Sequence, residues 1–187
     1  MPRAGLSTAA VVDAAVAVID DAGPGGLTLA AVAAHTGVAA PSLYKHVTGL
    51  GELRTLVGAR VIEEVTDRLS AAVLGRSRDD AVTALMHAYR GYVVAHPGRY
   101  AAIPPDPLRD PALADAGSKL LDVFLAVMHG YGLRDAPAVH AVRNLRSVVH
   151  GFTAIETSGG FGLAESLDDT YAQLIEMVLA GLPRSPR

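Results

Sequence analysis

Residues 28–47 have the sequence TLAAVAAHTGVAAPSLYKHV. Thr28 is a residue type that caps helices, and the apolar spacing after it predicts a short helix over residues 29–36 that Gly37 ends. A second short helix is predicted from Pro41, which suits the first turn of a helix, to about Val47. Two short helices joined by a tight turn at a glycine indicate a helix-turn-helix.

The second of these helices has an apolar side and an opposite side of small, polar and aromatic residues. Leu43 and Val47 can pack against Val32 of the preceding helix. The side chains that remain for the outer face are Ala39, Ala40, Ser42, Tyr44, Lys45 and His46. Small residues at its start would let the helix enter the major groove of DNA, and the larger ones could meet base edges and phosphates. The spacing alone is equally compatible with a helical hairpin whose Tyr44 and Lys45 are only solvated.

The same twenty residues resemble the DNA-binding signature of TetR-type (TetR/AcrR family) repressors. The shared pattern is a Thr-capped helix, then A-x-x-x-G-V, then Ser/Thr-Leu-Tyr-x-His-Phe/Val, and it matches here without a gap. The resemblance implies a phosphate contact at Thr28, base-reading positions at Ala39, Ala40, Pro41 and Ser42, backbone contacts from Tyr44 and His46, and a groove-facing Lys45.

One position departs from this pattern. The missing basic residue there agrees with the lack of net positive charge in the first part of the chain. The family usually places a phosphate-binding lysine just after the recognition helix, whereas the aligned position here is Leu50. Residues 1–62 carry as many basic as acidic side chains, so the net charge of −3 falls on the rest of the chain. Because DNA affinity comes largely from basic residues that neutralise phosphates, we expect weaker binding, with backbone N–H groups near Leu50 replacing the lysine.

The rest of the chain predicts an all-α fold. Helix-capping residues and Gly/Pro breaks predict helices over about 7–22, 50–74, 77–96, 111–130, 135–157 and 167–180. We expect a three-helix DNA-binding domain over 1–49 and a ligand-binding and dimerisation bundle over 50–187, connected by the helix 50–74.

Composition and motifs narrow the class of protein. Half of the residues are hydrophobic, which suffices for a sizeable core, and there is no Cys for disulfides, thiolate metal sites or a Cys nucleophile. Met1–Gly5 shows no signal peptide, and no apolar run is long enough to span a membrane, so we expect a cytoplasmic protein. The chain lacks H-E-x-x-H, G-x-S-x-G and a phosphate-binding loop, so we expect no enzyme activity, metal or cofactor.

Two later segments, 89–100 and 146–162, resemble one branch of TetR-type C-terminal domains. That resemblance implies a ligand cavity inside the bundle and a homodimer built from the last two long helices. The candidate ligand-binding residues are Met86, Tyr89, Tyr100, Phe124, Met128 and His150, because Met and aromatic side chains adapt to apolar ligands. The alternative for each is ordinary core packing. Gly91 and Gly151, inside predicted helices, suggest a close helix approach or room for a ligand.

The helices over 136–157 and 167–180 have wide apolar faces that suit a four-helix bundle formed by two copies about a twofold axis. The candidate interface residues are Val142, Val149, Tyr171, Leu174 and Val178. Two DNA-binding heads match a palindromic site. The sequence therefore predicts a ligand-responsive regulator, a repressor that a small, largely apolar molecule releases from operator DNA. The alternative is a DNA-binding activator or architectural protein without ligand control.

Overall fold

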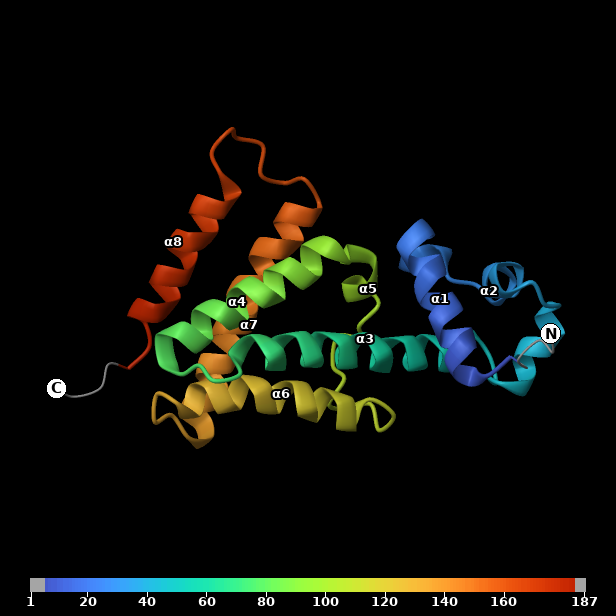
Figure 1. Ribbon diagram of the computed structural model, residues 1–187, viewed down its shortest axis with the longest axis horizontal. Helices are drawn as coiled ribbons and strands as arrows, with labels where there is room; N and C mark the ends of the chain where they lie inside the picture. Colours follow the sequence, from blue (N-terminus) through green and yellow to red (C-terminus); the bar gives the residue numbers. More distant parts are fainter. Residues whose placement is uncertain (1–5, 184–187) are drawn as a thin grey trace. The chain divides into compact units, whose positions relative to one another are not determined.

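The computed structural model describes residues 6–183, which are helical with no strand in that range. The elements are α1 (Thr8–Ala22), η1 (Pro24–Gly26), α2 (Leu29–Thr36), η2 (Ala40–Lys45), α3 (Leu50–Val73), α4 (Arg78–Ala95), α5 (Pro97–Ala101), α6 (Ala114–His129), α7 (Asp135–Thr157) and α8 (Leu167–Ala180) (Figure 1). The all-α fold predicted from the sequence is confirmed. The prediction that Met1–Gly5 contains no signal peptide concerns residues outside the described range.

The helices form two compact units. The first contains residues 6–64 and 96–118, and the second contains 65–95 and 119–183. The helices α3 and α6 therefore each contribute residues to both units. The predicted boundary at residue 49 separates a DNA-binding from a ligand-binding domain, whereas these two units are defined by packing. That functional boundary stays a prediction.

The first unit is built around α1, α2 and η2, and the caps form as the sequence predicts. The Ser7 and Thr28 hydroxyl oxygens accept hydrogen bonds from Ala10 N–H (3.2 Å) and Ala31 N–H (3.1 Å), which satisfies helix-end donors. Gly37 ends α2 in the left-handed conformation (φ +69°), which glycine adopts without steric cost. The core of the unit holds fully buried side chains of Val11, Val32, Leu43 and Val57.

The predicted recognition helix differs from expectation in its winding. It is a 3-10 helix over Ala40–Lys45, not an α-helix extending to Val47. The N–H groups of Ser42 and His46 donate to carbonyls three residues earlier, each at 2.8 Å, and this spacing defines the tighter 3-10 turn. Pro41 in its first turn supplies no N–H of its own.

In the second unit α4 lies against both α7 and α8 (Figure 1). Leu85, Met86, Leu145, Val149 and Tyr171 are buried at this junction. The buried hydroxyl of Thr153 donates back to the carbonyl of Val149 at 2.9 Å, so it adds no unpaired polar group to the core.

The starts of α6 and α4 each have a feature that the sequence pattern does not predict. The helix α6 begins at Ala114, not at Pro111, because the N–H groups of Leu113 and Ala114 both donate to the Asp110 carbonyl (2.9 Å each) and form a separate turn. At the start of α4, Arg78 has a positive φ of 52°, which is uncommon outside glycine.

Candidate functional site

Of the eight residues predicted to contact DNA, five are exposed and three are half-buried. Tyr44 is 60% exposed, although its ring is large and apolar. Thr28, Ala39, Pro41 and Lys45 are also exposed, while Ala40, Ser42 and His46 are half-buried. Leu43, within this stretch, and Val47, directly after His46, are buried. The 3-10 winding thus separates an outward polar and aromatic face from an inward apolar one.

This face is anchored to its neighbours by two polar contacts. The Thr8 hydroxyl of α1 donates to the His46 carbonyl (3.4 Å) at the end of η2. After the turn, the Glu52 carboxylate accepts the Thr48 backbone N–H (2.5 Å), and this bond lowers the pKa of Glu52. The carboxylate is therefore ionised at neutral pH beside the position where the resemblance places a phosphate contact, and where this chain has Leu50.

A chain of alternating charges joins α1, α3 and α5 within the first unit. Arg99 forms a two-pronged pair with Asp20 (2.8 and 2.6 Å) and also contacts Glu64 (3.0 Å). Arg60 continues the chain, because it pairs with Glu64 (3.3 Å) and Asp13 (3.5 Å). The hydrogen bonds raise the pKa of Arg99 and lower that of Asp20. The sequence pattern does not indicate this network, because Arg99 and Asp20 are 79 residues apart.

Five of the six candidate ligand-binding residues belong to the second unit, and one belongs to the first. Met86, Tyr89, Phe124 and Met128 are buried in the second unit, where the Tyr89 and Phe124 rings meet edge to face with centroids 6.1 Å apart. Tyr100 belongs to the first unit, and His150 is exposed on α7.

The two helix glycines differ in the space around them. A Cβ at Gly91 would meet the side chain of Arg68 at 3.4 Å, and a Cβ at Gly151 would meet nothing within 4 Å. Gly151 therefore marks an open part of α7 and not a close helix approach inside the unit.

Three of the five candidate interface residues are used inside the protomer. Val142, Val149 and Tyr171 are buried, so a partner cannot contact them without rearrangement. The Tyr171 hydroxyl donates to the Met86 carbonyl at 2.7 Å, and burial raises its pKa far above the usual value. An apolar pattern in the sequence does not distinguish a core face from a partner face, so it cannot separate these positions from a true interface.

Leu174 and Val178 are half-buried and line an apolar hollow of about 480 Å³ between α7 and α8. Met177, which lines the same hollow, is 70% exposed. The lining from α7 includes Pro137, His140, Ala141, Asn144 and Val148. None of these residues carries a carboxylate, an ammonium or a guanidinium group.

A half-buried ion cluster, also missed from sequence, fixes α7 and α8 on α4. Arg90 pairs with both oxygens of Glu156 (2.6 and 2.8 Å) and with Asp168 (2.7 Å). Its guanidinium also lies over the Tyr171 ring, 4.9 Å from the centroid. The hydrogen bonds that Arg90 donates to Glu156 are the main reason that the pKa of Arg90 is raised.

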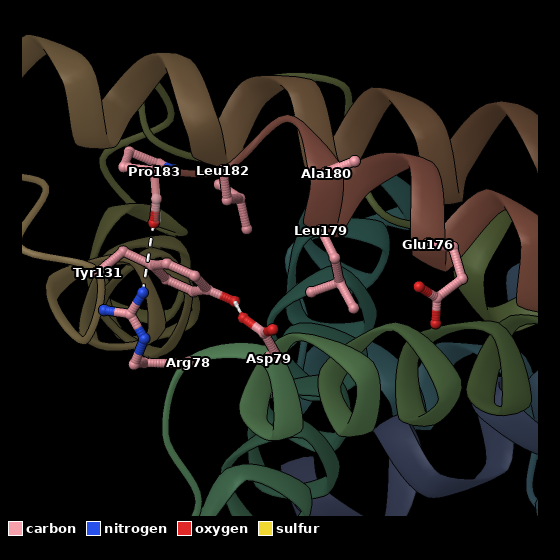
Figure 2. Close-up of a pocket in the computed structure, with 8 residues that line it drawn as sticks. All are labelled: Arg78, Asp79, Tyr131, Glu176, Leu179, Ala180, Leu182 and Pro183. Carbon is pink, nitrogen blue, oxygen red and sulfur yellow. Dashed lines mark hydrogen bonds between the residues drawn. The ribbon is translucent and has the colours of Figure 1, made fainter. Parts of the chain in front are cut away.

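Figure 2 shows a smaller hollow, of about 250 Å³, where α8 ends near the start of α4. The Tyr131 hydroxyl donates to Asp79 (2.6 Å), and burial with this bond raises the pKa of Tyr131. The Arg78 guanidinium covers the Tyr131 ring (4.7 Å) and donates to the Pro183 carbonyl (3.3 Å). These contacts fasten the end of α8 to the start of α4.

No helix within residues 6–183 combines the length and apolar character that crossing a membrane requires.

Comparison with known proteins gives consistent matches over both parts of the chain. Residues 11–47 match the family described as bacterial regulatory proteins, tetR family, and residues 82–178 match the tetracyclin repressor-like C-terminal domain. The HTH-type transcriptional regulator Rv0681 of Mycobacterium tuberculosis is 36% identical over 181 residues, covering 96% of this chain and 83% of the relative. The regulator YobS of Bacillus subtilis is 33% identical, covering 97% of this chain and 95% of the relative.

Among solved structures, a TetR variant from Acinetobacter baumannii in complex with minocycline superposes with a TM-score of 0.71 at 16% identity, covering 95% of this chain and 96% of that one. At this identity the likeness concerns the fold.

Proposed function

The chain belongs to the tetR family of bacterial transcriptional regulators, and from this premise we propose that it is a repressor that binds palindromic operator DNA as a homodimer and is released by a small ligand. The observation that carries the DNA-binding part is the exposed face of η2. Tyr44 and Lys45 project outward next to the fully buried Leu43, an arrangement that holds a reading face rigidly on a core. The family is one of regulators, not enzymes.

We assign roles on that face by the match to the family pattern. Thr28 and the outward Tyr44 and His46 contact phosphates, while the start of η2, from Ala39 to Ser42, meets base edges and Lys45 faces the groove. Small side chains at the start of η2 support this, because they let the backbone approach the bases closely. In functional terms residues 1–49 read DNA, and residues 50–187 bind the ligand and the partner subunit. A regulator of this kind acts in the cytoplasm, where operator DNA lies.

The homodimer is proposed to form through the uncharged face of α7 and α8. This face includes Leu174, Met177 and Val178, and it continues on α7 through Asn144 and Val148. An exposed apolar methionine beside an apolar hollow is self-complementary, since a twofold axis can place the methionine of each copy in the hollow of the other. Gly151, with open space at its Cβ position, also permits close approach of a second helix.

The ligand is proposed to be small and largely apolar, and to bind in the second unit among Met86, Tyr89, Phe124 and Met128. These side chains are buried now, but methionine side chains repack easily, so this core can open around a ligand. The minocycline complex of the Acinetobacter TetR supports a ligand-responsive role for this fold. A coupling of about 1–3 kcal/mol between ligand and DNA would release the operator roughly 5–150-fold.

Selection of operators from random DNA tests the proposal. Purified protein should enrich a palindromic sequence, and fluorescence anisotropy at fixed salt should then measure its affinity. A single unrepeated half-site as the enriched sequence would argue against a dimer on DNA. No enrichment at all would refute specific DNA reading. Small-molecule screening on the selected operator then tests release.

A further inference from the structure

The first unit contains an apolar hollow that the DNA-reading face does not use. Its volume is about 420 Å³, within the range of small-molecule sites. The walls come from the end of α1 and η1, from α3, and from α5 with the residues that follow it. All of its lining residues belong to the first unit.

The hollow is open because small residues line it, while its surroundings are tightly packed. Gly25, Ala101 and Ala102 in the lining have little or no side chain to fill the space. On either side the chain packs closely. A Cβ at Gly98 would lie 3.0 Å from the Ile19 carbonyl, and a Cβ at Gly58 would lie 2.9 Å from Pro104. The hollow is therefore a framed space and not a loosely packed surface.

Its lining combines an apolar floor with one cationic group. Ile19, Leu27 and Val57 are nearly fully buried and supply the floor. Arg54 supplies the charge, and its guanidinium has no hydrogen bond or ion pair within residues 6–183. The other arginines described in this unit, which are Arg60, Arg99 and Arg109, are each paired with a carboxylate.

We propose that this hollow binds a small monocarboxylate with an apolar body. The carboxylate would pair with the Arg54 guanidinium, which presents donors in the planar fork that carboxylates match, and the apolar body would lie on Ile19, Leu27 and Val57. The charge of Arg54 favours an anion over a neutral or cationic ligand of the same shape.

The position of the hollow gives its ligand a route to DNA binding. Leu27, part of the floor, directly precedes Thr28, the cap of α2 and first residue of the reading face. A bound carboxylate therefore changes operator affinity. This consequence rests on the proposed function, whereas the binding site itself does not.

Binding is measured on the full-length protein without DNA, by isothermal titration calorimetry with octanoate, decanoate and dodecanoate below their micelle concentrations. We expect at least one to bind, with decanol as the uncharged comparison. Arg54→Gln should weaken carboxylate binding about tenfold or more, because it removes a charged hydrogen-bond partner. Arg109→Gln removes the same charge from an exposed side chain of the same unit and should change nothing.

A second variant tests the apolar part of the hollow. Ala102→Leu should fill it and reduce binding, with thermal melting used to check that the unit still folds. If this variant is unfolded, Arg54→Gln still decides whether the hollow binds the carboxylate, because Arg54 is exposed and its substitution does not disturb the core.

Several results would overturn the proposal. These are no binding of any of the three carboxylates, equal binding of decanol, or unchanged binding in Arg54→Gln. Loss of operator affinity in Arg54→Gln with unchanged carboxylate binding would instead assign Arg54 to a DNA phosphate. Carboxylate binding by a protein that selects no operator would refute the proposed function and leave the site standing.

Discussion

The DNA-reading face and the α7–α8 face both expose a large apolar side chain, but their surroundings differ. Tyr44 is 60% exposed next to Lys45 and near Ser42, whereas Met177 is 70% exposed next to Val178 and near Leu174. An aromatic ring among hydrogen-bonding groups suits a hydrated, charged partner such as DNA. A methionine that lines a hollow without charged residues suits a second apolar surface. Exposure alone does not identify a partner face, since Leu163 is 84% exposed in a loop, and the neighbouring residues indicate which kind of partner each face suits.

The largest effect is expected where the reading face joins its core. Leu43→Ala removes a fully buried side chain next to the exposed Tyr44, and it should destabilise the protein by about 2–5 kcal/mol. Chemical denaturation measures this free energy of unfolding. A stability equal to that of the wild type would show that η2 is not held by its core as described.

The second effect concerns association. Met177→Asp should weaken a homodimer by about 3 kcal/mol or more, since each copy would bury an unpaired carboxylate. Sedimentation equilibrium measures the change. Leu163→Asp is the control, because Leu163 is 84% exposed in the loop before α8 and outside the proposed face. Equal dissociation by both variants, or by neither, would contradict the assignment of this face.

The third effect concerns the attachment of α7 and α8 to α4. Arg90→Gln should destabilise the second unit by about 2 kcal/mol, because Glu156 is left half-buried without its two-pronged partner. A double-mutant cycle with Glu156→Gln isolates the pair. If the two substitutions add without coupling, the ion cluster does not hold the α7–α8 face in place.

The fourth effect separates reading from folding. Tyr44→Ala should lower operator affinity by about 1.5 kcal/mol, the value of a hydrogen bond to a charged group, and leave the melting temperature unchanged. Anisotropy on the selected operator and thermal melting give the two numbers. A melting transition that falls as for Leu43→Ala would show that Tyr44 belongs to the core and not to the face.

The smallest effect is expected at Glu52. Its pKa is lowered by the Thr48 N–H, so it stays charged at neutral pH near the proposed phosphate position at Leu50. Glu52→Gln keeps a hydrogen-bond acceptor and removes the charge, so operator affinity should rise, by about threefold at most, and its salt dependence should change slightly. An unchanged or lower affinity would place Glu52 away from the DNA.

The local features of the fold were predictable because neighbouring residues determine them. The caps at Ser7 and Thr28, the stop at Gly37 and the start of α8 after Ser166 follow from residues within one helical turn. The 3-10 winding of η2 was not predicted, because both helix types satisfy the same short apolar pattern around Leu43.

The sequence by itself determined the all-α fold, the helix-turn-helix pattern and the family, because each depends on residue types at short fixed spacings. Only the tertiary structure decided how apolar residues divide between core and surface. It placed Val142, Val149 and Tyr171 inside and left Met177 outside, although all four lie on apolar helix faces. It also paired Arg99 with Asp20 and Arg90 with Glu156, and left Arg54 unpaired beside a hollow. The physical reason is that burial and ion pairing depend on segments far apart in sequence, which only folding brings together.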